Sequence, residues 1–433
     1  MIITAADPEY DARRTTFNAM VDRRPAEIHV CQGVEDVVAA VRRARDLDLP
    51  ISIRGGGHSV AGHCIGEGAL TIDLGGMRTI DVDARARTAA AAGGATWLDY
   101  DTATLAHGLA STGGTFADTG IAGLTLGGGI GFLMGTQGLT VDTLVGVQLV
   151  KADGGVVHAS ADENPDLFWA VRGAGANFGI VTRFEYRVQP VPDLYGGRIH
   201  YPLSAAAEVL RTTRDLALEA PDELTLQFVA GGSTGDVAVL ACFQGDEAAG
   251  ERLLRPLRSA APVVVDSLRG LSYAEMQATN DVLPFGLRHY WKGRFLPGLS
   301  DDQLAHSVAH AQGRPSSGFS AILIEFINGA PLRVPADAMA FNQRDAHVNA
   351  SALGIWTNPD ADDDHIKWAR DYTAGLTADA VGAEYVNYMA ESVPEDRIRA
   401  VYGAAKFERL RQLKREFDPD DVFRFNQNIT PAA

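Results

Sequence analysis

A run of three glycines, Gly55 to Gly57, directly follows a short β-branched stretch and an arginine in the sequence ISIRGGGHS, which runs from Ile51 to Ser59. Three consecutive residues without Cβ atoms leave the backbone N–H groups free to close onto a phosphate or a flat ring. His58 then stands directly beside whatever that backbone holds. Tight turns are also rich in glycine, so the run alone predicts either a plain turn or a ligand-binding loop.

A second glycine cluster in the N-terminal part of the chain favours the ligand-binding loop. It reads GIAGLTLGGGIG, from Gly120 to Gly131, and contains no charged residue. Such a segment cannot form a regular exposed helix, and we expect buried loop and short helix around a ligand. No GxGxxG stands between a strand and a helix near the N-terminus, so a nicotinamide-type Rossmann site is not supported.

Length and charge narrow the class of protein. The chain has 433 residues, 46% of them hydrophobic and 21% charged, which predicts a soluble globular protein with two domains. Its formal net charge of -17 argues against a nucleic-acid partner. We see no secretory signal and no stretch near the roughly 20 apolar residues that span a bilayer, so we expect a cytoplasmic location and no membrane partner.

Cysteine usage predicts neither a disulfide framework nor a metal site. The three cysteines, Cys31, Cys64 and Cys242, are an odd number, are widely spaced and form no CxxC pair. For Cys31 and Cys242 we favour the role of small buried hydrophobic residues. We therefore expect no bound metal.

Hydrophobic periodicity predicts an α+β region up to residue 192. We expect helices at 34–47 and 95–107, the second begun by Thr96 and ended at Gly108. A short helix at 164–171 would be capped by Asn164, with Pro165 in its first turn. Strands are expected at 27–31, 51–53, 70–74, 79–82, 88–92 and 180–188, and in a hairpin that joins 144–151 to 156–159.

The pattern of predicted strands and helices changes after the prolines at 190 and 192, and we place a domain boundary there. Strands are expected at 224–229 and 237–242 and a helix at 206–218. The stretch 320–327, SAILIEFI, is typical of a central strand, and Glu325 is its only charged residue. After residue 384 come YVNY, a helical stretch at 397–417 and FDPDDVFRFNQNITP.

A set of motifs, taken in order and spacing, resembles the berberine bridge enzyme-like family of FAD-linked oxidases, in the vanillyl-alcohol oxidase or para-cresol methylhydroxylase superfamily. The motifs are RGGGHS at 54–59, DTGIAGLTLGGGIG at 118–131, GLTVD at 138–142, ADG at 152–154, FGIVT at 178–182, YVNY at 385–388 and FDPDDVFRFNQNI at 417–429. The resemblance covers nearly the whole chain and is weakest at 193–384.

The resemblance implies an α+β fold with three parts. A two-lobed FAD-binding domain of the para-cresol methylhydroxylase type would span 1–192. A substrate domain at 193–384 would be built on an antiparallel sheet covered by helices. A C-terminal segment at 385–433 would return to the FAD-binding domain.

The resemblance also implies bound FAD and a covalent link at His58. His58 matches the histidine that such enzymes bond to the flavin 8α-methyl carbon, and a neutral imidazole is a competent nucleophile near pH 7. Many relatives form a second link through a cysteine. Phe116 occupies that place, and no cysteine lies between Cys64 and Cys242. We therefore expect a single link, through His58, and assign Cys64 a structural role because its context does not match.

Further residues are assigned to FAD binding by the resemblance. In the two glycine loops they are Arg54, Gly55, Gly56, Gly57, Ser59, Thr115, Asp118, Thr119, Gly120, Gly123, Gly127, Gly128 and Gly131. Gly179, Ile180 and Val181 match the adenine end, while the amides of Asn426 and Asn428 would either bond ring carbonyls or form an ordinary turn. Gly114 falls where relatives control dioxygen access, and a small residue there favours oxidase behaviour.

Tyr388 matches the second tyrosine of the family's YxNY motif, which serves as catalytic base in carbohydrate-oxidising relatives. Tyr385 is a second catalytic candidate, or else a packing residue whose hydroxyl bonds the backbone. A phenol with a pKa of about 10 is a poor base at neutral pH without a nearby positive charge or strong donor. Lys292 and Arg344 are candidates for that help. Three histidines are weaker candidates for the substrate pocket, each more typical of a structural histidine: His63, His289 and His347.

These inferences predict an FAD-dependent oxidase of a small-molecule natural product. Tyr388 would help to deprotonate an alcohol or C–H group, hydride would pass to flavin N5, and dioxygen would reoxidise the flavin to give hydrogen peroxide. An intracellular sugar or oligosaccharide oxidase is the alternative among enzymes. A flavin-binding protein with little turnover is the alternative of another class. We expect a monomer or a homodimer.

Overall fold

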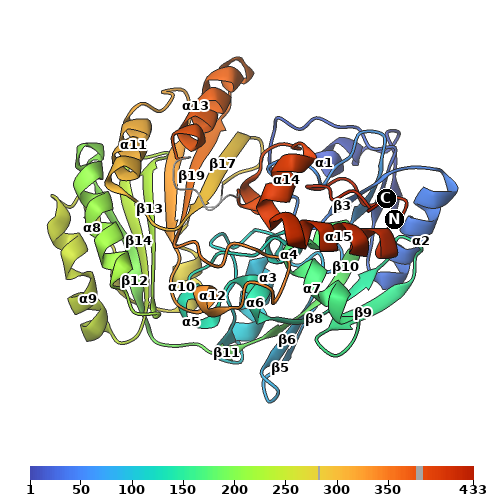
Figure 1. The fold of residues 1–433 in the computed structure, drawn as a ribbon, viewed down its shortest axis with the longest axis horizontal. Helices are drawn as coiled ribbons and strands as arrows, with labels where there is room; N and C mark the ends of the chain where they lie inside the picture. Colours follow the sequence, from blue (N-terminus) through green and yellow to red (C-terminus); the bar gives the residue numbers. More distant parts are fainter. Residues whose placement is uncertain (281–282, 377–383) are drawn as a thin grey trace.

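Three larger sheets organise the part of the chain that the structure describes. The computed structural model describes residues 1–280, 283–376 and 384–433. Two sheets from the N-terminal region lie on one side of the molecule, and one large sheet lies on the other (Figure 1). The predicted mixed α+β fold, with an antiparallel sheet covered by helices, is confirmed. The domain boundaries at 192 and 384 stay a prediction.

The first sheet has the strand order β1-β2-β4-β3 and holds the RGGGHS loop at one end. Strands β2 (Glu27–Val30), β4 (Leu70–Asp73) and β3 (Ile51–Arg54) run parallel, and β1 (Ile2–Ile3) pairs antiparallel with β2. Helix α2 (Val34–Asp46) buries an apolar face against them, and α1 is Tyr10–Arg14. The three glycines leave the carboxyl end of β3, where open α/β sheets commonly bind ligands.

The second sheet is antiparallel, in the order β5-β6-β10-β8-β9. Its strands are β5 (Ile80–Asp83), β6 (Thr88–Ala92), β8 (Leu144–Val150), β9 (Val156–Ser160) and β10 (Ile180–Arg187). The predicted hairpin is the pair β8 and β9. A two-stranded ribbon joins β7 (Leu109–Ala110) to β11 (Gln189–Pro190). Helix α3 (Trp97–Leu105) begins at Thr96 with a full capping box, as predicted.

The second glycine cluster forms the predicted buried loop and short helices. Helix α4 (Ile121–Leu126) starts directly after Gly120, and the loop that follows is almost entirely buried. Two further single-turn helices come next, α5 (Met134–Gln137) and α6 (Thr140–Thr143). Helix α7 (Pro165–Ala174) leads into η1 (Gly175–Asn177), a short 3-10 turn before β10.

The third sheet is antiparallel, with the order β15-β12-β14-β13-β18-β19-β17 and with β16 beside β12. Its strands are β12 (Leu194–Tyr201), β13 (Leu224–Gly231), β14 (Asp236–Gln244), β15 (Val265–Asp266), β16 (Arg269–Leu271), β17 (Arg288–Leu296), β18 (Ala321–Phe326) and β19 (Val348–Trp356). The short elements between them are η2 (Leu203–Ala205), α10 (Tyr273–Gln277), α12 (Ala330–Arg333) and η3 (Pro359–Ala361).

Four helices cover one face of the third sheet: α8 (Ala206–Leu218), α9 (Glu247–Ala260), α11 (Asp301–Gln312) and α13 (Asp362–Gly375) (Figure 1). Side chains alternate along a strand, so Ile322, Ile324 and Phe326 of β18 enter this covered core. Glu325, between them in sequence, points to the opposite face. That opposite face is turned toward the N-terminal side of the molecule.

Two local predictions are wrong. The helical stretch predicted at 397–417 is two helices, α14 (Glu395–Tyr402) and α15 (Ala404–Phe417). Gly403 separates them with a φ of 75°, a left-handed conformation that ends a right-handed helix. Asn164 does not cap α7 with its side chain, because its amide donates to the backbone oxygen of His158 instead.

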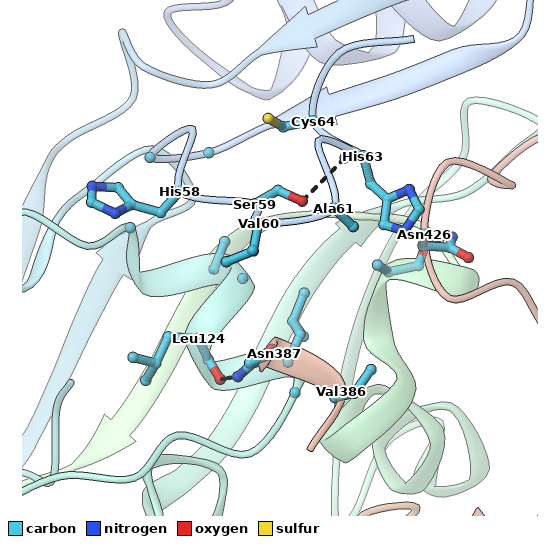
Figure 2. Close-up of a pocket in the computed structure, with 18 of the residues that line it drawn as sticks. His58, Ser59, Val60, Ala61, His63, Cys64, Leu124, Val386, Asn387 and Asn426 are labelled. Carbon is cyan, nitrogen blue, oxygen red and sulfur yellow. Dashed lines mark hydrogen bonds between the residues drawn. The ribbon is translucent and has the colours of Figure 1, made fainter. Parts of the chain in front are cut away.

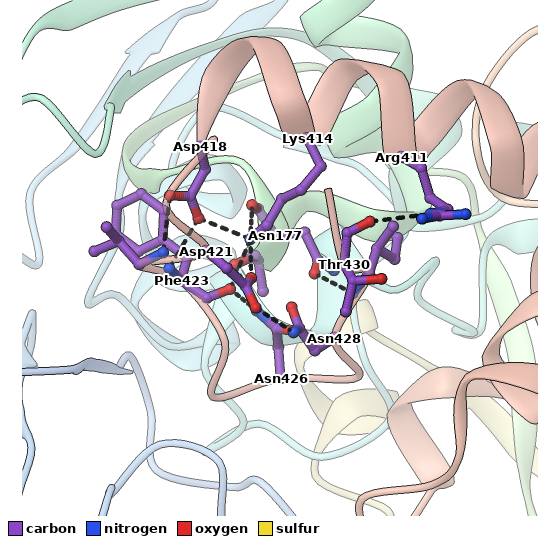
Figure 3. A network of polar contacts seen from close by, with 12 residues as sticks. Asn177, Arg411, Lys414, Asp418, Asp421, Phe423, Asn426, Asn428 and Thr430 are labelled. Carbon is purple, nitrogen blue, oxygen red and sulfur yellow. Dashed lines mark hydrogen bonds and ion pairs between the residues drawn. The ribbon is translucent and has the colours of Figure 1, made fainter. Parts of the chain in front are cut away.

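A fully buried lysine anchors the C-terminal loop to the N-terminal side of the molecule (Figure 3). Lys414 of α15 donates to the carboxylate of Asp418 at 2.7 Å and to the backbone oxygen of Phe423 at 3.0 Å. Its third bond goes to the backbone oxygen of Asn177, in η1, at 2.8 Å. Asp418 in turn accepts the N–H groups of Val422 and Phe423. Every proton of the ammonium therefore has a partner, and the loop is fixed against η1.

The described ranges, 1–280, 283–376 and 384–433, hold neither a membrane-spanning helix nor a metal-binding cluster. None of the helices there is long and apolar enough to cross a bilayer. The same residues contain no group of three or more histidine, cysteine or acidic side chains placed to hold a metal ion.

Candidate active site

A deep cavity lies where both glycine loops, the third sheet and the C-terminal segment meet. Its wall is drawn from the stretches 53–64, 115–130, 173–181, 385–389 and 425–427, together with Phe17, Leu283 and Trp291. Figure 2 shows the loop from His58 to Cys64 along one side of the cavity and Val386 and Asn387 on another. Segments hundreds of residues apart thus line one space.

The two glycine loops touch through their backbones. A Cβ atom on Gly56 would lie 2.5 Å from the nitrogen of Gly120, and a Cβ atom on Gly120 would lie 2.5 Å from the nitrogen of Gly56. No other residue type fits at either position without moving one loop. This close approach brings His58, two positions after Gly56, and Asp118, two positions before Gly120, to the same edge of the cavity.

His58 is held by a carboxylate and an aromatic ring. Its Nε2 lies 3.2 Å from Oδ2 of Asp118, and its imidazole stacks on Phe17 with the ring centroids 4.7 Å apart. Phe17 belongs to the N-terminal arm and stacks with its other face on His289, at 4.0 Å. The arm therefore connects the RGGGHS loop to strand β17 of the third sheet.

The rest of the RGGGHS loop is closed by local bonds. The hydroxyl of Ser59 accepts the backbone N–H of His63 at 3.1 Å (Figure 2). Burial lowers the pKa of His63 to about 4, so its ring is neutral at pH 7. Cys64 also lines the cavity, but burial raises the pKa of its thiol, which disfavours a reactive thiolate.

Tyr388 meets a buried acid at the sheet end of the cavity. Its hydroxyl donates to Oε1 of Glu325 at 3.3 Å, and its ring lies edge-on to Trp291 at 5.5 Å. Glu325 is 1% exposed, and the amide of Asn349 donates to its other oxygen at 2.7 Å. Burial raises the pKa of Glu325 to about 7, against the lowering effect of these hydrogen bonds.

The two cations expected to activate Tyr388 are engaged elsewhere, so both predictions are wrong. Lys292 pairs with Glu384 at 3.4 Å. Arg344 forms a buried, bidentate ion pair with Asp142, with Nη2 at 2.6 Å from Oδ1 and Nη1 at 3.0 Å from Oδ2. Burial and the neighbouring Glu325 both raise the pKa of Tyr388, the opposite of what a free phenolate base requires.

Tyr385 has the packing role that was the alternative at the sequence level. Its hydroxyl accepts the backbone N–H of Gly129 at 2.9 Å and the amide of Asn387 at 3.0 Å. Burial raises its pKa, and its ring packs edge-on against Phe295. Asn387 also donates to the backbone oxygen of Leu124 at 3.1 Å (Figure 2), so the YVNY turn is tied to α4.

The C-terminal amides offer acceptors rather than donors to the cavity. The nitrogen of Asn426 donates to the backbone oxygens of Ala176 and Phe423, and that of Gln427 donates to Glu391. Their side-chain oxygens are buried and have no partner among the described residues. These amides would thus accept from an N–H group of a ligand, and the predicted bonds to ring carbonyls do not fit Asn426.

Most residues that the sequence assigned to the cofactor or to catalysis line this one cavity: Gly55, Gly56, Gly57, His58, Ser59, Thr115, Asp118, Thr119, Gly120, Gly123, Gly127, Gly179, Ile180, Val181, Tyr385, Tyr388 and Asn426. Phe116, at the place that the resemblance gives to a cysteine, also lines the wall.

Five assigned residues lie outside the wall. Arg54 donates to the backbone oxygen of Thr15, and Asn428 donates to Asp421. The other three are glycines that permit close packing: Gly114 against Leu124 and Trp97, Gly128 against Phe341, and Gly131 against the backbone of Gly113. A larger side chain at position 114 would meet Leu124 and Trp97, and the role of Gly114 in dioxygen access stays a prediction.

Of the three candidate histidines, one lines the cavity and two do not. His63 lines the cavity, and its Nε2 has no partner in the described part of the chain. His289 is buried in the stack on Phe17, and burial lowers its pKa to about 3. His347 is exposed.

Sequence reasoning missed Glu325, Phe17 and Trp291 as parts of the site. For Glu325 a signal was present, because it is the only charge in an apolar strand and must either pair or line a cavity. For Phe17, in an arm without clear periodicity, the sequence holds no such signal.

The cavity fits the expected FAD. Five buried polar atoms of residues in its wall lack partners within the described chain: His63 Nε2, Asp118 Oδ1, Trp291 Nε1, Asn426 Oδ1 and Gln427 Oε1. The glycine loops expose backbone where a pyrophosphate or ribityl chain could approach. A long ligand with N–H and acceptor groups along its length would complete this wall.

Comparison with known families agrees with this fit. Residues 25–160 match the family described as FAD binding domain, and residues 384–430 match the family described as berberine and berberine like. The two matches contain the glycine loops and the YVNY turn, which are the parts of the wall described above.

Individual relatives span the whole chain. The (R)-6-hydroxynicotine oxidase of Paenarthrobacter nicotinovorans is 31% identical, over 100% of this chain and 97% of the relative. A crystal structure of 6-hydroxy-D-nicotine oxidase from Arthrobacter nicotinovorans superposes with a TM-score of 0.91, at 31% identity, over 100% of this chain and 98% of that one. Glucooligosaccharide oxidase from Acremonium strictum, described with a 6-S-cysteinyl, 8α-N1-histidyl FAD, has a TM-score of 0.89 at 25% identity, over 100% and 97%.

The buried Glu325 predicts a pH dependence of stability. Its pKa rises from about 4.5 in the unfolded chain to about 7 in the folded one, so the folded state resists ionisation. The contribution of Glu325 to the free energy of unfolding is therefore largest below the pKa that its carboxyl has in the unfolded chain. This contribution falls by about 3 kcal/mol as the pH rises to the pKa that the carboxyl has in the folded chain. In Glu325→Gln this loss is absent.

The measurement is the free energy of unfolding from denaturant titrations at several pH values, taken as the difference between the natural protein and Glu325→Gln. Other titrating groups cancel in this difference. A difference that stays constant with pH would contradict a raised pKa at Glu325.

Proposed function

The chain belongs to the berberine and berberine-like family of FAD-linked oxidoreductases, and on that premise we propose that it is an oxidase of a small natural product, with FAD bonded to the chain through His58 alone. Relatives named as oxidases support dioxygen as the electron acceptor. The observation that carries the proposal is that His58 and Tyr388 line one cavity, and that the hydroxyl of Tyr388 donates to the buried Glu325.

The Tyr388–Glu325 pair supplies a base without a free phenolate. Because the hydroxyl of Tyr388 already donates to Glu325, it can accept a proton from a substrate hydroxyl or C–H group as its own proton moves to the carboxylate. With a pKa of about 7, Glu325 is partly ionised at neutral pH and can receive that proton. FAD, when bound, supplies the two-electron acceptor that the chain itself lacks.

The residues that would hold FAD are those of the two glycine loops, Gly179 to Val181 and the C-terminal amides. A single covalent link follows from the side chains at the two loop positions. His58 offers an imidazole, whereas Phe116, at the place that the resemblance gives to a cysteine, offers no nucleophile. The glucooligosaccharide oxidase relative is described with both a cysteinyl and a histidyl bond. The thiol of Cys64, with its raised pKa, is a poor second nucleophile.

The apolar and aromatic side of the wall supports a flat, largely apolar substrate. Phe17, Leu283 and Trp291 line it beside Tyr388, and Phe285 packs edge-on to His58. A nicotine-type compound is the substrate named for one relative. The alternative, a sugar or oligosaccharide, is supported by the glucooligosaccharide oxidase relative and by the tyrosine base.

The first test measures whether flavin is covalently attached to the polypeptide. After denaturing electrophoresis, the natural protein should retain flavin fluorescence on the polypeptide band, and His58→Ala should lose it, because an alanine has no nucleophile. Cys64→Ser serves as the matched control and should retain it. A fluorescent His58→Ala band would refute the single link.

The second test compares classes of substrate by their ability to reduce the flavin. Aromatic amines and polyketides should bleach the flavin absorption under anaerobic conditions, while sugars should not. Tyr388→Phe should lower the bleaching rate by about 10²–10⁴-fold with the active substrate, because the proton relay is lost. Bleaching by sugars alone would favour the alternative, and bleaching by no compound of either kind would favour a flavin-binding protein with little turnover.

A further inference from the structure

We propose that Asn18 is a positioning residue for the substrate site: its amide joins the first glycine loop to the edge of strand β17 and so fixes the spacing of the two walls between which a flat substrate lies. The inference rests on the proposed function, in which the cavity takes such a substrate beside the flavin. It gives a function to the N-terminal arm, residues 15–20, in which the sequence shows no clear periodicity.

Asn18 uses every hydrogen-bonding group of its side chain. Its nitrogen donates to the backbone oxygens of Val60 at 2.6 Å and of His289 at 2.9 Å. Its oxygen accepts the backbone N–H groups of His289 at 2.9 Å and of Met20 at 3.0 Å. An amide has two N–H groups and two acceptor sites, and here all four are engaged. Asn18 is only 3% exposed, so the loss of these bonds would leave buried backbone groups without partners.

The bonds to His289 complete an open sheet edge. Strand β17 comes last in the order of the third sheet, so its outer edge carries backbone groups without a neighbouring strand. At His289 the amide of Asn18 accepts the N–H and donates to the oxygen, as a neighbouring antiparallel strand would do. Two residues earlier, the backbone oxygen of Leu287 accepts the N–H of Ala19 at 2.8 Å. The arm thus takes the place of a further strand at this edge.

The same arm is bonded to the first glycine loop. The backbone N–H of Phe17 donates to the oxygen of Gly57 at 3.0 Å, and Asn18 reaches Val60, three residues further along the loop. The ring of Phe17, which is 2% exposed, fills the space between the loop and β17 and lies edge-on to Trp291 at 5.9 Å. Two consecutive residues of the arm therefore contact both walls of the cavity.

Both ends of this bridge belong to the cavity wall. Val60 lines the cavity from the loop, and Trp291 lines it from β17. Trp291 comes two residues after His289, so their side chains lie on the same face of the strand, and their rings meet edge-on at 5.7 Å. Fixing the backbone of His289 therefore fixes the indole of Trp291. The bridge through Asn18 thus sets the width of the cavity beside Tyr388, whose ring lies edge-on to the indole at 5.5 Å.

A purely stabilising role for Asn18 would have a different consequence. If Asn18 only held the arm in place, its loss would lower the free energy of unfolding and leave ligand binding in the cavity unchanged. If it sets the spacing of the walls, its loss lets the loop and β17 move apart, and a flat ligand loses its fit. Such displacements matter, because a shift of about 1 Å at a reacting centre costs roughly 10²-fold in rate.

The first measurement is hydrogen exchange along β17 in the full-length flavoprotein, read by mass spectrometry. Asn18→Ala removes both bonds to His289, so exchange there should be roughly 10-fold faster than in the natural protein. The matched control is Asn328→Ala, because the amide of Asn328 also donates to two backbone oxygens, those of Pro221 and Leu224, and does not line the cavity. The control should leave exchange at β17 unchanged. Unchanged exchange at β17 in Asn18→Ala would overturn the inference.

The second measurement is the binding of quinoline, a flat and uncharged aromatic probe, read as a change in the flavin absorption bands. Asn18→Ala should raise the dissociation constant of quinoline roughly 10-fold, because the walls are no longer held ready for a flat ring. Asn18→Asp should weaken binding similarly, because an ionised carboxylate still accepts the N–H of His289 but has no proton to donate to Val60. Asn328→Ala should bind quinoline as the natural protein does.

The outcomes separate the inference from the function on which it rests. Equal dissociation constants for the natural protein and Asn18→Ala, with a lowered free energy of unfolding in the variant, would overturn the positioning role and leave a structural one. If quinoline does not change the flavin bands of the natural protein, the flat substrate of the proposed function is contradicted. The exchange result then decides by itself whether Asn18 fixes β17.

Discussion

The contact between Gly56 and Gly120 is the constraint on which the site depends. With 2.5 Å between a Cβ atom on one residue and the backbone nitrogen of the other, the two loops can meet only where both residues lack side chains. The meeting sets His58 opposite Asp118 and leaves backbone exposed along the cavity. The rest of the fold can be understood as support for this meeting: β3 presents one loop, and α3 and α4 present the other.

Two acid pairs then give the ends of the cavity different chemistry. At one end, Asp118 faces the imidazole of His58, and at the other Glu325 faces the phenol of Tyr388. In the second pair the hydroxyl of Tyr388 donates its proton to the acid. The C-terminal loop, fixed by the buried Lys414, closes a further side and presents the oxygens of Asn426 and Gln427. The cavity is thus polar where a cofactor would lie and aromatic where a substrate would enter.

Sequence patterns predicted the fold class, the sheets and helices of the N-terminal region, and most of the cavity wall, because glycine runs and alternating strands are local signals. They failed where a role depends on distant partners. Lys292 and Arg344 were plausible activators of Tyr388 by charge alone, yet each has an acid of its own, Glu384 and Asp142. Glu325 became a functional candidate only when the pairing of β18 with β19 placed it beside Asn349 and under Tyr388.

On the proposed function, one cavity holds the flavin with its ring near the Tyr388–Glu325 pair. The most direct measurement is the visible absorption spectrum of the purified flavoprotein, recorded from about two pH units below to about two above the pKa of about 7 of Glu325. Ionisation of a buried carboxyl near the ring should shift the flavin bands with a midpoint near that pKa, and Glu325→Gln should show no such transition. An identical transition in the variant, or none in the natural protein, would contradict the account.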